Sequence, residues 1–192
     1  DRFLHDRDAT SLFLFPLTAL AQDQISALSA MTDDWATDDS PRISVYDGDT
    51  SSHFRGKIRK YPPQVLVTNP DMLHLAILPF HAQWTTFLAS LSLVVIDEMH
   101  TYRGVFGAHM AQVLRRPTRI APLSVARLPF VSCSTPIDNP AATARRSTGR
   151  APQSVTRGRS PQGNLHFLFL PLAATPATAH SLLLPGVPSR TP

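Results

Sequence analysis

Short apolar segments alternate with helical segments along most of this chain. Strand-like runs rich in Val, Ile, Leu and Phe occupy residues 11–15, 43–46, 65–67, 93–96 and 130–132. Helical patterns occupy residues 18–31, 52–60, 81–90 and 107–116, and a further helix begins at Pro70. Strands that alternate with helices pair in parallel, so the pattern predicts an α/β fold, with a parallel sheet flanked by helices. The polar turns after these strands would then meet at one edge of the sheet.

Composition narrows the class of protein. The chain has 192 residues and 43% hydrophobic residues, which favours one soluble domain with a real core. No apolar run approaches the roughly 20 residues that span a bilayer, so no membrane association is expected. The single cysteine, Cys133, excludes an internal disulfide, fits a cytoplasmic location, and is interpreted as a small buried hydrophobe. The chain starts with neither Met nor a signal peptide, so we expect an internal fragment.

Charge and proline content change along the chain. Residues 1–100 carry 7 basic and 13 acidic side chains, and residues 101–192 carry 11 and 1, giving net charges of −6 and +10. A basic half favours a polyanionic partner, although 16 of 18 basic residues are Arg, which a GC-rich genome also explains. Twelve of 18 prolines follow Arg116. We therefore expect a main domain over 1–140, a degenerate end over 141–170 with an edge strand at 165–170, and a poorly ordered Pro-rich tail over 171–192.

One strand runs directly into two acids. Val94, Val95 and Ile96 precede Asp97 and Glu98, and His100 follows. Glu98 is the only glutamate of the chain. The sequence is typical of a Walker B, or DExH, box, in which Asp97 would bind the Mg²⁺ of ATP and Glu98 would activate water. The alternative is a buried strand that ends in two exposed acids, because a motif this short also arises by chance.

Other strand ends carry motifs in a fixed order. Phe15 to Gln24 is similar to helicase motif Ia, Thr68 to His74 to motif Ib, Asp97 to His100 to motif II, and Ser134 to Pro140 to a damaged motif III. Further matches cover residues 47–50, 78–81 and 101–109. Together they resemble superfamily 2 DEXH-box helicases of the MrfA/YprA-type branch, which are ATP-dependent DNA helicases linked to repair. The resemblance implies a partial RecA-like, P-loop NTPase domain over residues 10–140.

The resemblance also implies roles for the turns after the strands. Backbone N–H groups and helix N-termini at such turns bind phosphates. We expect contacts to single-stranded or partly duplex DNA, and the oligomeric state stays open. The expected nucleic-acid-binding residues are Pro16, Leu17, Thr18, Ala19, Gln22, Gly48, Thr68, Asn69, Pro70 and Asp71. For Gln22, a solvated helix face is an equal alternative.

His100 is the expected coupling residue. In the family this position communicates with motif III, here Ser134 and Thr135, and links the nucleotide state to the grip on nucleic acid. Three other histidines, at positions 74, 81 and 109, lack metal-ligand spacing and are interpreted as hydrogen-bonded structural residues. Arg103 would bind phosphate or pair with an acid, and the sequence does not choose between them.

The chain departs from the family in two places. It contains no Gly-x4-Gly-Lys-Ser/Thr loop, which the family would place before Asp1, and the second RecA-like domain would follow Pro192. The family's Ser-Ala-Thr reads Ser134-Thr135-Pro136, so a hydroxyl is lost. Pro117, Pro122 and Pro136 fall in expected helix or strand, where a helix-interior proline costs about 3 kcal/mol. These changes indicate relaxed selection, a degraded gene copy or a sequencing error.

The sequence thus predicts part of an ATP-dependent DNA helicase motor that is inactive as an isolated chain. The catalytic expectation rests on Asp97, Glu98 and His100, with ATP and Mg²⁺ as cofactors of the complete protein. A non-enzymatic nucleic-acid-binding module and a non-functional remnant are the alternatives. A third is an ATPase half that completes its site with another chain.

Overall fold

The computed structural model describes residues 6, 8–16, 18–32, 40–117, 128–135 and 137–155. The chain divides into two compact units, Asp1–Ser154 and Val155–Pro192. All described helices and strands belong to the first unit, whose architecture follows. The expected strand at residues 165–170 and the expected tail lie outside the described residues.

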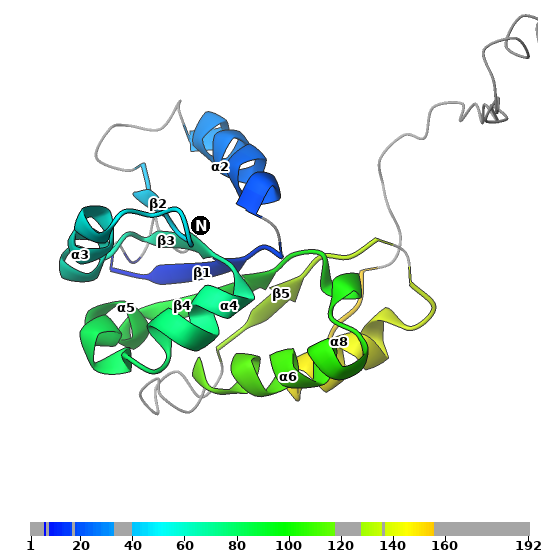
Figure 1. Cartoon of the computed structure of the whole chain (residues 1–192). Helices are drawn as coiled ribbons and strands as arrows, with labels where there is room; N and C mark the ends of the chain where they lie inside the picture. Colours follow the sequence, from blue (N-terminus) through cyan, green and yellow to red (C-terminus); the bar gives the residue numbers. More distant parts are fainter. Residues whose placement is uncertain are drawn as a thin grey trace, which may run out of the picture. The chain divides into compact units, whose positions relative to one another are not determined.

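A five-stranded parallel sheet forms the centre of the first unit (Figure 1). Its strands are β1 (Thr10–Leu14), β2 (Ile43–Tyr46), β3 (Val65–Thr68), β4 (Leu91–Ile96) and β5 (Phe130–Ser132). They lie in the order β2-β3-β1-β4-β5, and every neighbouring pair is parallel. The predicted α/β fold class with a parallel sheet is confirmed.

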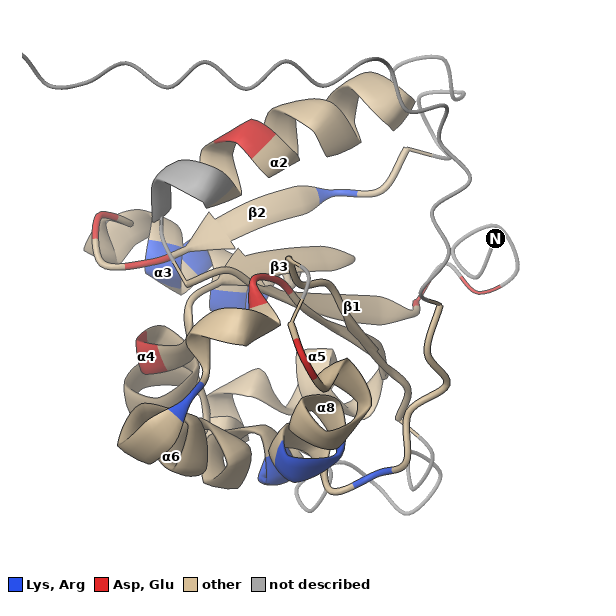
Figure 2. Ribbon diagram, turned by 90° about the vertical axis from the view of Figure 1, so that its right-hand side faces the viewer, with Lys and Arg blue, Asp and Glu red and all other residues tan. Residues whose placement is uncertain are grey.

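Helices connect successive strands. The α-helices are α2 (Thr18–Thr32), α3 (Ser52–Lys60), α4 (Pro70–Met72), α5 (Thr85–Ala89), α6 (Gly104–Arg115) and α8 (Pro140–Thr148). A π-helical turn, Leu73–Ile77, continues α4, and 3₁₀ turns cover His81–Trp84 and Met99–Thr101. Figure 2 shows α2 on one face of the sheet and α4, α5, α6 and α8 on the other.

Two apolar clusters hold these layers together. The larger one joins inward side chains of the strands, such as Leu12, Leu66 and Ile96, to the helices on the α5, α6 and α8 side. The smaller one places Ala21 of α2 against the opposite sheet face, where Phe15 and Val67 lie. Burial on both faces explains why the strands read as continuous apolar runs instead of alternating ones.

Two expectations need correction. The predicted helix 107–116 begins at Gly104 and ends at Arg115, so Pro117 lies beyond its C-cap residue, Arg116. The predicted helix 81–90 is a 3₁₀ turn followed by the short α5.

Helix α8 lies in the stretch that was expected to be degenerate. The Asn139 side chain caps its start by accepting from the Ala142 N–H at 3.1 Å, and Pro140 follows in the first turn. Gly149 ends the helix in the left-handed conformation, at φ 76°. Asn-Pro before a helix and Gly after it are recognised start and stop signals, which the high proline content of this region obscured. Pro122 and Pro136 lie outside the described residues.

Candidate functional site

The carboxyl ends of all five strands lie at one edge of the sheet. Leu14 is in register with Thr68 of β3 and with Ile96 of β4. Tyr46 is in register with Thr68, and Ile96 with Ser132. The motifs found in the sequence begin at or just after these strand ends. The structure therefore brings the motif turns together at the edge where parallel α/β sheets bind ligands.

The Asp97-Glu98 pair is fixed by the two neighbouring strands. The Asp97 N–H donates to Leu14 O at 3.0 Å, and the Met99 N–H donates to Cys133 O at 2.9 Å. Ile96 and Met99, which flank the two acids, are buried in the larger apolar cluster. The acids themselves are only half-buried. A turn anchored at both ends thus presents two carboxylates at the edge.

Glu98 adopts a left-handed backbone conformation, with φ 48° and ψ 43°. Among the described residues it is the single non-glycine residue with positive φ. Its carbonyl accepts from both the N–H and the hydroxyl of Thr101, at 2.9 and 2.8 Å, which holds this conformation. Backbone strain of this kind costs about 1–3 kcal/mol and is concentrated at functional sites.

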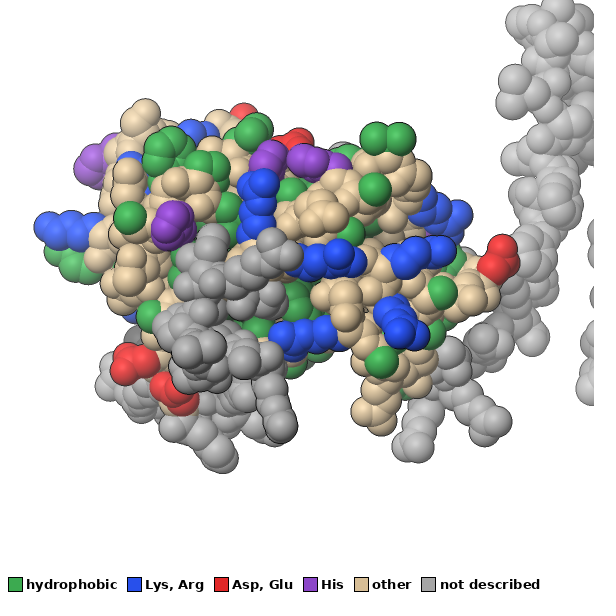
Figure 3. All heavy atoms as spheres, turned by 90° about the horizontal axis from the view of Figure 1, so that it is seen from below, with side chains coloured by type: hydrophobic (Ala, Val, Ile, Leu, Met, Phe, Trp, Pro, Cys, Tyr) green, Lys and Arg blue, Asp and Glu red, His purple; other side chains and the backbone are tan. Residues whose placement is uncertain are grey.

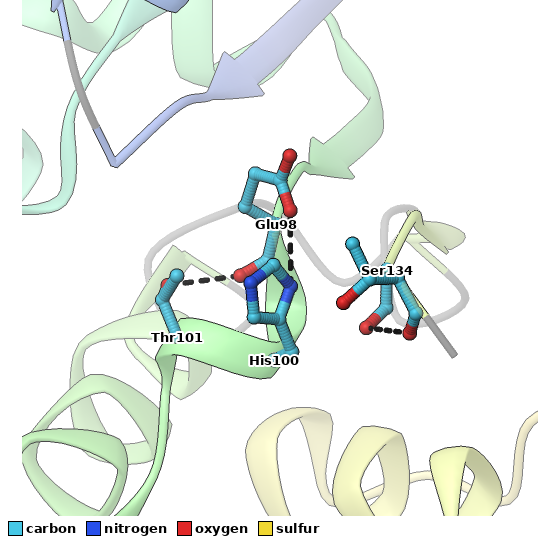
Figure 4. Close-up of polar contacts among 5 residues, drawn as sticks. Glu98, His100, Thr101 and Ser134 are labelled. Carbon is cyan, nitrogen blue, oxygen red and sulfur yellow. Dashed lines mark hydrogen bonds and ion pairs between the residues drawn. The ribbon is translucent and has the colours of Figure 1, made fainter. Parts of the chain in front are cut away.

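His100 lies against the Glu98 carboxylate. Its Nδ1 is 2.9 Å from Glu98 Oε2, an ion pair when the imidazole is protonated (Figure 4). Both side chains keep about 30% of their surface exposed. The two expected catalytic residues therefore touch each other, and His100 restricts the rotamers of Glu98.

The residues of the box fit a magnesium ion. Carboxylate oxygens are the ligands that Mg²⁺ prefers, and it typically takes one or two of them together with substrate phosphates and water. Asp97 supplies one such carboxylate, and Glu98 stands next to it in the chain. Within the described ranges, no group of three or more His, Cys, Asp or Glu side chains is arranged to hold a metal by itself. The donor set thus suits an ion that arrives with a nucleotide.

Two residues to which the sequence analysis gave no functional role lie beside the box. Cys133 is exposed, which corrects its interpretation as a buried hydrophobe. Partial burial and then the charges of Asp97 and Glu98 raise the pKa of its thiol, so the thiol stays protonated at neutral pH. Tyr102 is buried, and burial followed by the Asp97 charge raises its pKa strongly. Cys133 lies beside Asp97 and Glu98 because β5 pairs with β4. No local sequence signal predicts this position.

The turn after β3 is built by capping. Asn69 Oδ1 accepts from the Met72 N–H at 2.8 Å, and Pro70 takes the first helical position, as the sequence predicted. Thr68 is 3% exposed and its hydroxyl donates to Tyr46 O at 2.5 Å. Pro70 is also buried, whereas Asp71 is exposed. The buried Thr68 and Pro70 side chains shape the turn, so contact with a ligand falls to backbone groups and to Asn69 and Asp71.

The turn after β1 lies beside the turn after β3, since the Phe15 N–H donates to Thr68 O at 3.0 Å. Pro16 is half-exposed, and Gln22 is exposed on α2. Leu17 lies outside the described residues, and Thr18 and Ala19 begin α2. The two turns expected to bind nucleic acid are therefore neighbours.

The turn after β2 is locked by Asp47. Its Oδ1 accepts from the Asp49 N–H and from the N–H and hydroxyl of Thr50, at 2.8–3.1 Å. The Arg55 guanidinium donates to the carbonyls of Asp47 and Gly48, at 2.8 and 3.0 Å. Gly48 is exposed, and a Cβ there would meet nothing within 4 Å. The Gly48 carbonyl already accepts from the Arg55 guanidinium. A ligand at this turn would therefore contact its backbone N–H groups.

The expected coupling residues follow β5. Ser134 and Thr135 are both exposed, and the Ser134 hydroxyl donates to Thr135 O at 2.8 Å. The bond between Met99 N–H and Cys133 O brings this segment next to the box, and Figure 4 shows Ser134 beside Glu98 and His100. In this structure the Ser134 hydroxyl is engaged by its own segment.

Two of the three remaining histidines have the expected polar contacts. His81 Nδ1 lies 3.1 Å from Leu78 O, and His74 Nδ1 lies 3.3 Å from the Arg116 guanidinium. The ring of His109 packs edge-on against His74, with centroids 4.8 Å apart. Burial, His109 and Arg116 lower the pKa of His74, although Asp71 opposes them.

Comparison with known proteins identifies the family. A sequence model of the DEAD/DEAH box helicase family matches residues 2–142. This chain belongs to the DEAD/DEAH box helicases. The ATP-dependent helicase YprA of Bacillus subtilis (strain 168) is 43% identical over 164 residues, covering 85% of this chain. The ATP-dependent helicase HRQ1 of Saccharomyces cerevisiae (strain ATCC 204508 / S288c) is 42% identical over 142 residues, covering 73% of it.

A solved structure agrees with these relatives. The crystal structure of the DUF1998 helicase MrfA bound to DNA and AMPPNP superposes with a TM-score of 0.76 at 40% identity, over 84% of this chain. The predicted RecA-like helicase domain of the MrfA/YprA-like branch is thereby confirmed. The chain spans 22% of the length of YprA and of the MrfA chain, and 13% of HRQ1. No helix in the described part of the chain is long and apolar enough to cross a membrane.

Proposed function

We propose that this chain is part of the motor of an ATP-dependent DNA helicase, in which ATP hydrolysis drives movement along DNA. The observation that carries the proposal is the placement of Asp97 and Glu98. They stand at the carboxyl edge of a RecA-like sheet, fixed by β1 and β5, beside the turns that resemble nucleic-acid motifs. Relatives named as ATP-dependent helicases, and one solved with DNA and AMPPNP, support the same interpretation.

In this proposal the two acids have separate roles. Asp97 holds the Mg²⁺, which when bound neutralises charge on the nucleotide phosphates. Glu98 orients the attacking water and accepts its proton. His100, 2.9 Å from Glu98 Oε2, keeps that carboxylate in one orientation and is the proposed link to Ser134 and Thr135. Because Glu98 has a left-handed backbone conformation, its side chain does not continue the alternating side-chain directions of β4.

The DNA strand would lie along the turns after β1, β2 and β3. We propose that the backbone at Pro16, Thr18, Ala19 and Gly48, together with the side chains of Gln22 and Asn69, faces this strand. Contacts of this kind bind the sugar-phosphate backbone, so affinity depends on salt more than on base sequence. We propose single-stranded or partly duplex DNA as the substrate.

The isolated 192-residue chain should not hydrolyse ATP. It contains no Walker A lysine and hydroxyl to bind the β- and γ-phosphates, and Gly56-Lys57, the nearest decoy, is followed by Ile58. The test is phosphate release by the purified chain with ATP, Mg²⁺ and oligo(dT), beside the Glu98→Gln variant as control. DNA-stimulated release that disappears in Glu98→Gln would show that the chain completes an active site by itself or with a second copy.

A second candidate is a nucleic-acid-binding module without catalysis, favoured by the net charge of +10 over residues 101–192. Titration of labelled oligo(dT) with the chain at several salt concentrations distinguishes this module from a remnant. A module binds saturably with a negative salt slope, whereas a remnant gives no saturable binding.

A further inference from the structure

A groove runs between α6 and α8, and no residue of the turns after β1, β2 and β3 lines it. Its volume is about 700 Å³, within the roughly 300–1,000 Å³ of ligand sites in proteins. It begins at Tyr102 and Arg103, just after the 3₁₀ turn of the box, and continues between the two helices to Arg115 and Arg146. Gly107 allows α6 to lie against Tyr102, because a Cβ at Gly107 would be 2.4 Å from Tyr102 O.

Positive charge lines this groove at both ends. Arg103, Arg115 and Arg146 are among its lining residues, against one acid, Asp138, so the charged side chains give +3 − 1 = +2. Arg103 and Arg146 are exposed. Figure 3 shows Lys and Arg side chains gathered on the face of the molecule below the sheet, where α6 and α8 lie, with little red among them.

One of the lining arginines, Arg115, is held in place by a backbone carbonyl. The Arg115 guanidinium donates to Arg146 O at 2.9 Å and so ties the two helix ends together. Beside the groove, the Arg150 guanidinium donates to Leu128 O at 2.6 Å and lies over the Phe130 ring. The planar donor arrays of exposed guanidinium groups, such as those of Arg103 and Arg146, match phosphate oxygens.

The length of the groove fits a polymer. Arg103 and Arg115 stand twelve residues apart on one helix, or about 18 Å at a rise of 1.5 Å per residue. That is roughly five steps at the 3.4 Å rise of one DNA strand. The upper end opens next to Asp97–His100, at the edge where the other turns meet.

We propose that the groove between α6 and α8 binds the sugar-phosphate backbone of a DNA strand, as a contact separate from the turns after β1, β2 and β3. Arg103 and Arg146 bind phosphates at its two ends, and Arg115 holds the helices at the spacing that admits them. The groove binds a strand whether or not the turns at the carboxyl edge do so.

The test is fluorescence anisotropy of labelled oligo(dT) with the complete 192-residue chain at 50–200 mM salt. The double variant Arg103→Gln/Arg146→Gln removes two proposed phosphate contacts. Each contact changes log K by about 0.7 per tenfold change in salt for single strands, so the slope should fall by about 1.4. The same factor predicts binding roughly 25-fold weaker at 0.1 M salt. Circular dichroism checks that the variant stays folded, as expected for two exposed side chains.

Two further variants separate the possible outcomes. Lys57→Gln/Lys60→Gln removes two charges from α3 and should leave the slope unchanged. Asn69→Asp keeps the helix cap but adds a negative charge at the carboxyl edge, so it reports on the turns alone. If Asn69→Asp weakens binding and the arginine variant does not, the groove proposal fails while the proposed function stands. The reverse pattern supports the groove and counts against the turns.

A competitor of different chemistry completes the test. Poly-glutamate should displace oligo(dT) only at much higher charge concentration, because a carboxylate polymer does not reproduce the phosphate spacing. The proposal is overturned if the wild-type chain shows no saturable DNA binding. It is also overturned if poly-glutamate binds more tightly than DNA and loses that binding in the arginine variant, which would identify an acidic protein segment as the ligand.

Discussion

Gly107→Ala should destabilise the protein, although the same change in another helix should stabilise it. Gly107 and Gly56 both lie inside helices, α6 and α3, where alanine is favoured over glycine by about 0.5–1 kcal/mol. At Gly56 a Cβ meets nothing within 4 Å, so the chain keeps that gain. At Gly107 a Cβ would lie 2.4 Å from Tyr102 O and 2.6 Å from Tyr102 C, both backbone atoms.

The distances at Gly107 give the size of the displacement that a Cβ would require. Ordinary contact begins at 3.4 Å, so the backbone of Tyr102 or α6 must move by 3.4 − 2.4 = 1.0 Å. Because both contacted atoms are backbone, the cost lies at the upper end of the overpacking range, about 2–3 kcal/mol, and a helix gain of about 1 kcal/mol leaves a net loss of about 1–2 kcal/mol. At about 2–4 °C per kcal/mol, Tm should fall by roughly 2–8 °C for Gly107→Ala and rise by roughly 1–4 °C for Gly56→Ala.

Thermal unfolding followed by circular dichroism at 222 nm measures both shifts in one experiment. Tyr102 ends the turn that begins at Glu98, so the loss in Gly107→Ala also reports on how tightly α6 packs against that turn. Equal shifts in the same direction would refute this packing, because helix propensity would then explain both variants without any contact to Tyr102.

Three further predictions concern single contacts. Asn69→Ala should cost about 1 kcal/mol in a urea unfolding curve through loss of the helix cap, whereas Asn69→Asp should be nearly neutral; equal losses would contradict the cap. Burial and His109 lower the pKa of His74 in the folded state, so the unfolded chain binds more protons and this contribution to stability is lost as pH falls through about 6.5. His74→Gln should flatten Tm between pH 7.5 and 5.5, and an unchanged pH profile would exclude this contribution. Glu98→Gln should speed alkylation of Cys133 at pH 8, because removal of the charge lowers the pKa of the thiol; an unchanged rate would mean that the carboxylate is not near the sulfur.

The sequence was sufficient for the sheet because each strand is a continuous apolar run followed by turn chemistry. Asn69 and Pro70 mark the start of α4, and Asp47 marks a turn, since these residues bond to their own backbone or fix its conformation. Such local interactions can be predicted from the order of the residues. The turns that carry the motifs could be assigned to one edge of the sheet, because parallel strands all end at the same edge.

Contacts between distant segments could not be read in the same way. Cys133 stands beside Glu98 only because β5 pairs with β4, and Tyr102 is buried only because α6 packs over it. Thr68 looks like a polar ligand residue in sequence, but its hydroxyl is bonded to the neighbouring strand. The sequence analysis did not assign helix α8, whose ends are set by the capping residues Asn139 and Gly149. In each case tertiary contacts decide the role of a side chain that local sequence leaves open.

The central claim is that Asp97 and Glu98 are competent catalytic residues of a DNA-dependent ATPase. The most direct measurement is DNA-stimulated phosphate release by a chimera in which residues 2–142 of this chain replace the matching segment of Bacillus subtilis YprA. We expect the chimera to hydrolyse ATP in the presence of single-stranded DNA, and Glu98→Gln to reduce the rate by at least about 100-fold, the usual contribution of a general base. A folded chimera that binds DNA but releases no phosphate, or one whose rate is unchanged by the Glu98→Gln substitution, would contradict the claim.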